Sequence, residues 1–145
     1  MRTEIPIEIV ELEGEGIHLF VKGNLNINTE CNLIIDTGAS KTVFDNNLSE
    51  EFFKIETTNN EMITAGVNAE QIKTQIGKTD FFSIGKLEIK NFESILIDLE
   101  HINCLYEKLK NRKIYGLIGS DFLMKYKANI DFRKKILSLE YKKMK

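Results

Sequence analysis

Apolar and polar residues alternate with a period of two over much of the chain, and this alternation predicts a protein built mostly of β-strands. It is clear over residues 5–12 and continues over residues 17–27, with a bend or bulge predicted at Gly23-Asn24. Two alternating segments near the end, residues 130–132 and 136–141, predict a closing hairpin. The pattern therefore favours a mostly-β fold.

The middle of the chain predicts a long hairpin and several shorter strands. Residues 55–76 are polar but rich in β-branched side chains and are interrupted at Gly66, which predicts two strands joined near that glycine. A turn is predicted at Lys90-Asn91. The shorter strands around it are predicted over residues 81–84, 86–89 and 92–97.

Three short helices are predicted among the strands. An Asn-x-x-Glu sequence has the form of a helix start and predicts one or two helical turns over residues 47–54. Apolar positions spaced three and four apart predict an amphipathic helix over residues 100–110. Ser120, a residue type that caps helices, predicts a further short helix over residues 121–126.

Length and composition favour one compact domain over residues 1–145, because a single proline and the lack of a Ser/Gly-rich tract leave no linker. With 42% apolar and 29% charged residues the chain can bury a core. A net charge of −2 gives no broad attraction to nucleic acid or to an anionic membrane. No apolar run is long enough to span a bilayer or act as a signal peptide, so we expect a cytoplasmic protein.

The cysteines and histidines give little support to metal or nucleophilic catalysis. Cys31 and Cys104 are too few for a disulfide framework and suit a reducing compartment. With His18 and His101 as the two histidines, a His-rich zinc site and Ser-His or Cys-His catalysis have few candidates. We therefore expect neither a metal nor a cofactor. The lysine-rich tail, residues 142–145, is interpreted as a solvated end.

Two short apolar runs, residues 33–35 and 115–119, have the pattern of strands covered on both faces. The first leads directly into Asp36-Thr37-Gly38-Ala39-Ser40, which is followed by a predicted strand at residues 42–44. A carboxylate at the end of a buried strand is costly unless hydrogen bonds hold it. A threonine hydroxyl and a glycine N–H can supply those bonds, although an ordinary turn could carry the same three residues.

The stretch at residues 33–40 resembles the active-site loop of the aspartic proteases, in which a hydrophobic pair precedes Asp-Thr/Ser-Gly-Ala/Ser. Residues 116–123 are similar to the second signature of that family, a hydrophobic pair before a glycine and then a short helix. Because the chain has one Asp-Thr-Gly and 145 residues, it resembles the single-domain, dimeric retropepsin-like branch over roughly residues 15–141. The resemblance implies a closed acid-protease barrel, mostly β, with two or three short helices.

This resemblance implies a homodimeric aspartic endopeptidase that cleaves peptide or protein substrates. One Asp36 supplies only a base, whereas two Asp36 carboxylates brought together share one proton and act as base and acid at once. The family also implies that Thr37 braces the two active-site loops. It further implies that Gly38, Ala39 and the flap tip at Gly66 contact the substrate, and that no metal, cofactor or covalent intermediate takes part.

The chain departs from the retroviral members at two positions. Ser40 and Ser120 stand where those proteins often carry an acidic residue and an arginine that pair at the edge of the dimer. The dimer must therefore be held by other contacts, for which residues 1–14, the helix at residues 100–110 and the terminal strand at residues 136–141 are candidates.

Two alternatives to the endopeptidase remain open. One is the same dimeric fold acting as a peptide-binding or dimerisation module with little or no hydrolysis, which the missing edge pair and the glycine-poor flap leave possible. The other is a purely structural β domain in which both signatures are accidents. If a monomer were active, a second acid would have to come from the same chain, and Asp121 and Asp131 are the first candidates.

Overall fold

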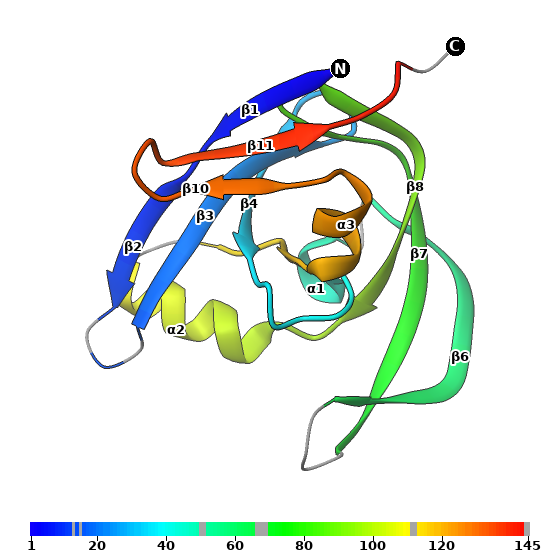
Figure 1. Ribbon diagram of the computed structural model, residues 1–145. Coiled ribbons are helices and arrows are strands. Elements are labelled where there is room, and N and C mark those ends of the chain that lie inside the picture. Colours follow the sequence, from blue (N-terminus) through cyan, green and yellow to red (C-terminus); the bar gives the residue numbers. More distant parts are fainter. Residues whose placement is uncertain (13, 15, 50–51, 66–69, 111–112, 144–145) are drawn as a thin grey trace.

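The computed structural model describes residues 1–12, 14, 16–49, 52–65, 70–110 and 113–143, which form eleven strands and three short helices (Figure 1). The first strands are β1 Arg2–Pro6, β2 Glu8–Leu12, β3 Gly16–Leu25, β4 Thr29–Ile35, β5 Val43–Asp45 and β6 Lys54–Ala65. The others are β7 Glu70–Ile84, β8 Leu87–Ile97, β9 Gly116–Ile118, β10 Asn129–Asp131 and β11 Ile136–Glu140. The helices are α1 Asn46–Ser49, α2 Glu100–Lys110 and α3 Ser120–Lys125.

Six strands form a closed barrel, in the order β3-β4-β9-β5-β8-β7. The ring closes because β3 pairs with β4 along its length and also with β7 near its end, where Leu25 lies opposite Phe82. β2 pairs with β3 and β6 pairs with β7, so these two strands extend the same sheet beyond the closed ring. The predicted mostly-β barrel with two or three short helices is confirmed.

A second sheet of three strands joins the two ends of the chain in the order β1-β11-β10. β1 and β11 are antiparallel, with Ile5 opposite Leu137. The predicted strand over residues 5–12 therefore divides at Pro6 into two strands that belong to different sheets. Proline has no N–H to donate, and the next residue, Ile7, donates its N–H to Lys135 O at 2.9 Å.

The core contains an aromatic cluster inside the barrel. Phe44 and Phe82 are fully buried, and their ring centroids lie 5.7 Å apart in an edge-to-face arrangement. Phe92 stacks on Phe82 at 4.7 Å, and Phe122 of α3 lies 6.3 Å from Phe82. The apolar run at residues 33–35 is buried throughout, as its pattern predicts. α3 is thereby anchored to the barrel through its one buried aromatic side chain.

One predicted turn is wrong, a predicted bend or bulge is regular strand, and each difference has a local explanation. β8 runs without a break through Lys90-Asn91, where Asn91 takes up the irregularity with a φ of 53°. The turn lies instead at Gly85, whose φ is +59° and where a Cβ would lie 2.5 Å from Thr3 Oγ1. β3 also continues through Gly23, where a Cβ would come within 3.0 Å of Ser83 O. That glycine allows a close approach of β7 rather than a bend.

The helices follow the predictions in place but differ in detail. α2 matches the predicted residues 100–110, and its Tyr106 packs edge-to-face against Phe20 with the centroids 5.2 Å apart. α1 is shorter than the predicted residues 47–54 and starts earlier, because Asp45 accepts the N–H of Asn47 at 3.2 Å. Among the described residues, no helix combines the length and apolarity that crossing a membrane requires.

Candidate active site

Asp36 lies directly beyond the end of β4, where the barrel brings the two signatures of the sequence together. β4 and β9 are parallel neighbours, with Leu33 opposite Gly116 and Ile35 opposite Ile118. The register continues one residue further, because Asp36 N donates to Ile118 O at 2.9 Å. The buried strand pair thus fixes the backbone from which the carboxylate projects.

The loop after β4 folds back on the carboxylate of Asp36. Asp36 Oδ1 accepts the N–H of Gly38 at 3.0 Å, and Asp36 O accepts the N–H of Ala39 at 3.1 Å. A Cβ at position 38 would lie 3.3 Å from Asp36 Oδ1, so glycine allows the backbone to come this close. The Asp36 side chain is half-buried, and Thr37 and Gly38 are exposed. The carboxylate is therefore oriented by its own loop and remains open to solvent.

The second signature braces this loop from the other side. Ser120 Oγ donates to Thr37 O at 2.7 Å, and Ser120 N donates to Ala39 O at 2.8 Å. A Cβ at Gly119 would lie 2.7 Å from the Lys41 carbonyl, so this position has no room for a side chain. The predicted cap by Ser120 is wrong, because Gly119 occupies the cap position of α3 and Ser120 begins the helix.

A further pair of residues, which the sequence did not single out as a brace, holds the far end of the loop. Thr42 donates both its N–H and its hydroxyl to Asp121 Oδ1, each at 2.8 Å. Thr42 Oγ1 in turn accepts the N–H of Gly119 at 3.0 Å. The signal in the sequence was an acidic residue in the first turn of α3, which also accepts a backbone N–H from that turn.

Asp121 and Asp131, the candidates for a second acid in a monomer, both accept hydrogen bonds from backbone N–H groups. Asp121 Oδ1 accepts three hydrogen bonds, from Thr42 and from Phe122 N. Asp131 Oδ1 accepts the N–H groups of Arg133 and Lys134, each at 2.9 Å, and so shapes the turn between β10 and β11. Each carboxylate therefore has a local role in shaping the fold.

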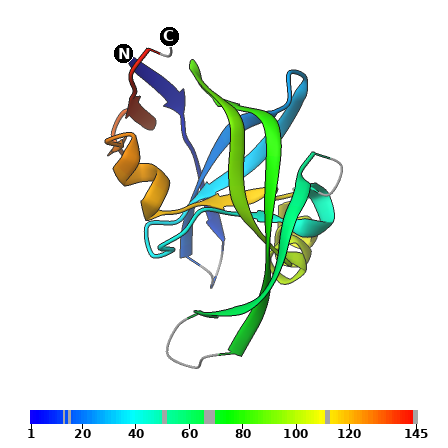
Figure 2. The same ribbon diagram turned by 90° about the vertical axis from the view of Figure 1, so that its right-hand side faces the viewer.

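The predicted flap corresponds to the hairpin of β6 and β7. Its strands pair as far as Ala65 opposite Glu70, and Gly66, the predicted tip, lies outside the described residues. In both views the hairpin reaches past the end of the barrel at which the Asp36 loop lies (Figures 1 and 2). The structure therefore places Asp36, Thr37, Gly38 and Ala39 in one loop, with the long hairpin at the same end of the molecule.

Metal-binding and thiol groups do not gather at this loop. Within the described ranges, no three side chains from His, Cys, Asp and Glu come together in a way that could hold a metal ion. Cys31 is buried in β4, and burial raises the pKa of its thiol to about 12. This thiol is a protonated core group, and the chemistry available at the loop is that of carboxylate and hydroxyl.

The comparisons with known proteins agree with this loop and this barrel. The family model for aspartyl protease matches residues 21–122, which is more than half of the sequence and includes the first signature and all but the last residue of the second. The chain therefore belongs to the aspartyl protease family. Among curated proteins, no sequence matches significantly.

Solved structures with the same fold come from several sources. A retropepsin-like aspartic protease from Rickettsia conorii matches with a TM-score of 0.52 and 18% identity, over 96% of this chain and 90% of that one. The retroviral protease-like domain of Ddi1 from Leishmania major matches with a TM-score of 0.55 and 15% identity, over 86% of this chain and 90% of that one. EIAV protease, solved with an inhibitor, matches with a TM-score of 0.52 and 17% identity, over 80% of this chain and 93% of that one. The fold is thus that of the retropepsin-like aspartic proteases.

Proposed function

We propose that the protein is an aspartic endopeptidase whose active site combines the Asp36 carboxylates of two copies of the chain. The observation that carries the proposal is the Asp36 loop. One carboxylate oxygen is held by the Gly38 N–H, and Ser120 braces the neighbouring carbonyls of Thr37 and Ala39. Such a loop presents a carboxylate in a fixed orientation at the surface, as a general base requires.

A second copy supplies the acid that one chain lacks. Two carboxylates brought close together cannot both ionise easily, so they hold one proton between them. The ionised Asp36 takes a proton from water as the oxygen attacks the peptide carbonyl, and the protonated Asp36 gives its proton to the carbonyl oxygen. The diol then collapses: one Asp36 carboxyl gives its proton to the leaving nitrogen, the other Asp36 carboxylate takes a proton from a diol hydroxyl, and the C–N bond breaks.

The other residues of the loop are proposed to position the chains and the substrate. Thr37 is exposed beside Asp36 and would meet its counterpart across the twofold axis. The backbone of Gly38 and the side chain of Ala39 would line the peptide, with Gly66 closing over it from the hairpin. A cytoplasmic location suits the two free cysteines, Cys31 and Cys104.

The dimer is proposed to form around the Thr37 loop and the terminal sheet. β1 and β11, the terminal strands expected to hold it, pair with each other within one chain, which leaves β1 and β10 as the edges of that sheet. The Ser120 hydroxyl is already engaged within its own chain, where it donates to Thr37 O. Association would therefore depend on apolar burial and strand pairing more than on ion pairs.

Substitution of Asp36 by asparagine tests the proposal. The Asp36→Asn protein should keep its fold and its dimer, because the amide is nearly isosteric and removes the repulsion between two carboxylates. It should lose peptide hydrolysis, because an amide cannot take a proton from water. Purified wild-type protein should cleave a peptide library, detected by mass spectrometry, and retained cleavage by Asp36→Asn would contradict the assignment.

A peptide-binding module without hydrolysis is the second candidate. The observation that favours it is that Ser40 and Ser120 offer no ion pair at the dimer edge, and Ser120 is already engaged within the chain. The same library separates the two functions. A binding module would retain peptides without cleaving them, and would do so equally well with Asp36 or Asn at this position.

A further inference from the structure

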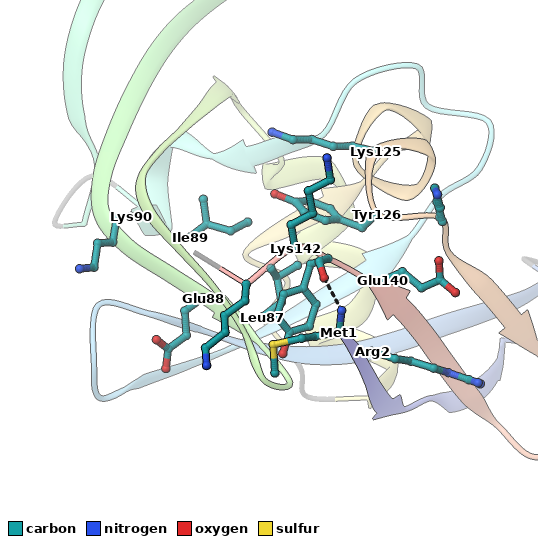
Figure 3. Close-up of a pocket in the computed structure, with 13 residues that line it drawn as sticks. Met1, Arg2, Leu87, Glu88, Ile89, Lys90, Lys125, Tyr126, Glu140 and Lys142 are labelled. Atoms are coloured by element: carbon teal, nitrogen blue, oxygen red, sulfur yellow. Dashed lines mark hydrogen bonds between the residues drawn. The ribbon is translucent and has the colours of Figure 1, made fainter. Parts of the chain in front are cut away.

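A cavity of about 880 Å³ lies where the two ends of the chain meet α3 and β8 (Figure 3). A second cavity of about 560 Å³ shares four residues with it and continues along α3 to Thr42 and Asp121. We call the two together the lysine groove. The shared residues are Ile89, Lys90, Lys125 and Tyr126. The groove thus leads from the terminal sheet to the pair that braces the Asp36 loop.

The rim of the first cavity is strongly basic although the whole chain carries a net charge of −2. Six basic side chains and two acidic ones, Glu88 and Glu140, line it. The basic ones are Arg2, Lys90, Lys125, Lys127, Lys142 and Lys143. These residues come from both ends of the chain, from β8 and from the end of α3, so the fold and not a run of sequence concentrates the charge.

The lysines of the rim have no acidic partners in the described part of the chain. The ion pairs found there join Arg2 to Glu4 at 3.4 Å and Lys22 to Glu30 at 3.3 Å, and none joins a lysine of the groove to a carboxylate. The ammonium group of Lys125 lies 5.5 Å from the centre of the Tyr126 ring. In the view of Figure 3, the carboxylate of Glu140 points away from Lys125 and Tyr126.

The floor of the groove is apolar and aromatic. Leu87 is buried at 4% exposure, while Ile89, Tyr126 and Tyr141 are half-buried. An apolar floor beside five lysines that have no ion-pair partner among the described residues matches a ligand that carries both apolar side chains and spaced negative charges. A uniformly charged phosphate backbone matches it less well, because Glu88 and Glu140 interrupt the basic rim, whereas a peptide can space its carboxylates to avoid them. A second copy of the chain would place this basic surface against itself.

We propose that the lysine groove binds an acidic, extended segment of the protein substrate, away from the bond that is cleaved. This inference rests on the proposed endopeptidase activity, since it names a class of substrate. Carboxylates of the segment would lie against Lys125 and Lys142, and its apolar side chains would pack on Tyr126 and Ile89. Because the groove ends beside Thr42, a bound segment would be held close to the Asp36 loop.

Binding is tested first, without hydrolysis. The probe is a fluorescein-labelled peptide of about ten residues in which Glu alternates with Leu, so that the charges fall on one face of an extended chain. Its control carries Gln in place of each Glu. Binding of both peptides is measured by fluorescence anisotropy with three proteins, each of which carries Asp36→Asn. The first has no other change, the second also carries Lys125→Gln and Lys142→Gln, and the third carries the matched control Lys134→Gln. Lys134 is exposed in the turn at the opposite end of β11.

The Glu peptide should bind more tightly than the Gln peptide, and the double substitution should weaken it about threefold to tenfold, since exposed ion pairs contribute modestly. Lys134→Gln should change nothing, and added salt should weaken the Glu peptide. Equal binding of the two peptides, or an equal loss with Lys134→Gln, would overturn the inference. Binding of an oligonucleotide or of anionic vesicles in place of the peptide would overturn it too.

Hydrolysis then separates this inference from the proposed function. A short neutral peptide that the wild-type protein cleaves is extended with the Glu-Leu segment. The extension should lower KM in the wild type and not in the Lys125→Gln/Lys142→Gln protein, while cleavage of the short peptide stays the same in both. Binding of the Glu peptide without any cleavage would contradict the proposed endopeptidase activity and leave the proposed binding at the lysine groove standing. If the dimer dissociates in the double variant, the groove is a contact between subunits, and the inference that it binds substrate is overturned.

Discussion

At the scale of single residues, the loop that carries Asp36 is held by hydrogen bonds to Thr42 as much as by its own turn. Thr42 is buried, donates twice to Asp121 and accepts from Gly119 N. One hydroxyl therefore links the first signature of the sequence to the second. Its removal would leave the buried N–H of Gly119 without this partner.

The substitution Thr42→Val removes the hydroxyl and keeps the shape of the side chain. We expect the free energy of unfolding to fall by about 1–3 kcal/mol, because Gly119 N and Asp121 lose a buried partner. Thr42→Ser keeps the hydroxyl and is the matched control, with a smaller loss. Urea denaturation of the three proteins measures the difference, and equal stability of the Val and Ser variants would contradict the role given to the hydroxyl.

The two cysteines should differ sharply in reactivity. The pKa of Cys31 is raised to about 12 by burial, so this thiol stays protonated and unreactive at pH 8, whereas Cys104 is exposed. Mass spectrometry after iodoacetamide treatment should show one modification in the folded protein and two in urea. Two modifications without denaturant would contradict the burial of Cys31.

The same shift predicts how stability depends on pH. The pKa of about 12 keeps the folded thiol of Cys31 protonated well above pH 9, while the unfolded thiol loses its proton near its ordinary pKa of 9.0. The folded state then binds more protons, so stability is lost as pH rises above about 9. Cys31→Ala should remove this part of the decline, which denaturation curves at pH 8 and pH 10 can measure against wild type.

At the scale of elements, α2 is tied to the barrel by a buried carboxylate. Asp45, at the end of β5, accepts hydrogen bonds from Leu99 N and from Asn103 Nδ2. Asn103 also donates to Ile114 O and accepts from Ile114 N, which fixes the approach to β9. The helix thus positions the strand that leads to the second signature.

The substitution Asn103→Ala should cost about 2–4 kcal/mol in unfolding free energy, because several buried polar groups lose their partner together. Glu107→Ala, an exposed position on the same helix, should change stability by less than about 0.5 kcal/mol and is the control. Thermal and urea unfolding of both variants test this. A neutral Asn103→Ala would show that α2 does not depend on this network.

Much of this element list could be predicted from the sequence, because the strand periods and the two apolar runs are local signals. The division at Pro6 could not be predicted in detail, since it depends on a partner strand about 130 residues later. The turn at Gly85 was missed because Asn91 imitates a turn while remaining inside β8. Of the candidate site, Asp36, Thr37, Gly38 and Ala39 come from a local sequence signature and stay predictions, whereas the bracing by Thr42 and Asp121 depends on tertiary contacts.

At the scale of the whole molecule, one chain offers half of the proposed active site. Specific activity should therefore fall on dilution as dimers separate, and should depend little on salt because few ion pairs are available. Activity and sedimentation across a dilution series, at low and high salt, measure this. A species that stays monomeric and keeps its full specific activity would contradict the two-chain mechanism.

A shared proton between two Asp36 carboxylates also predicts a bell-shaped dependence of rate on pH, with the best rate below neutrality. Statine-type inhibitors, which imitate the diol intermediate, should block the activity, and chelators and thiol reagents should not. Initial rates with each reagent test the assignment. Loss of activity with a chelator and its return with zinc would point to a different chemistry.

The pairing of the first strand with the last has a consequence for the order in which the protein can fold during synthesis. β1 leaves the ribosome before the other described strands and its partner β11 after them, and the brace of the Asp36 loop at residues 118–121 comes late as well. Contacts so distant in sequence form slowly. A nascent chain would therefore carry the Asp36 loop before residues 118–121 brace it, and peptide cleavage would begin only after synthesis of the whole barrel.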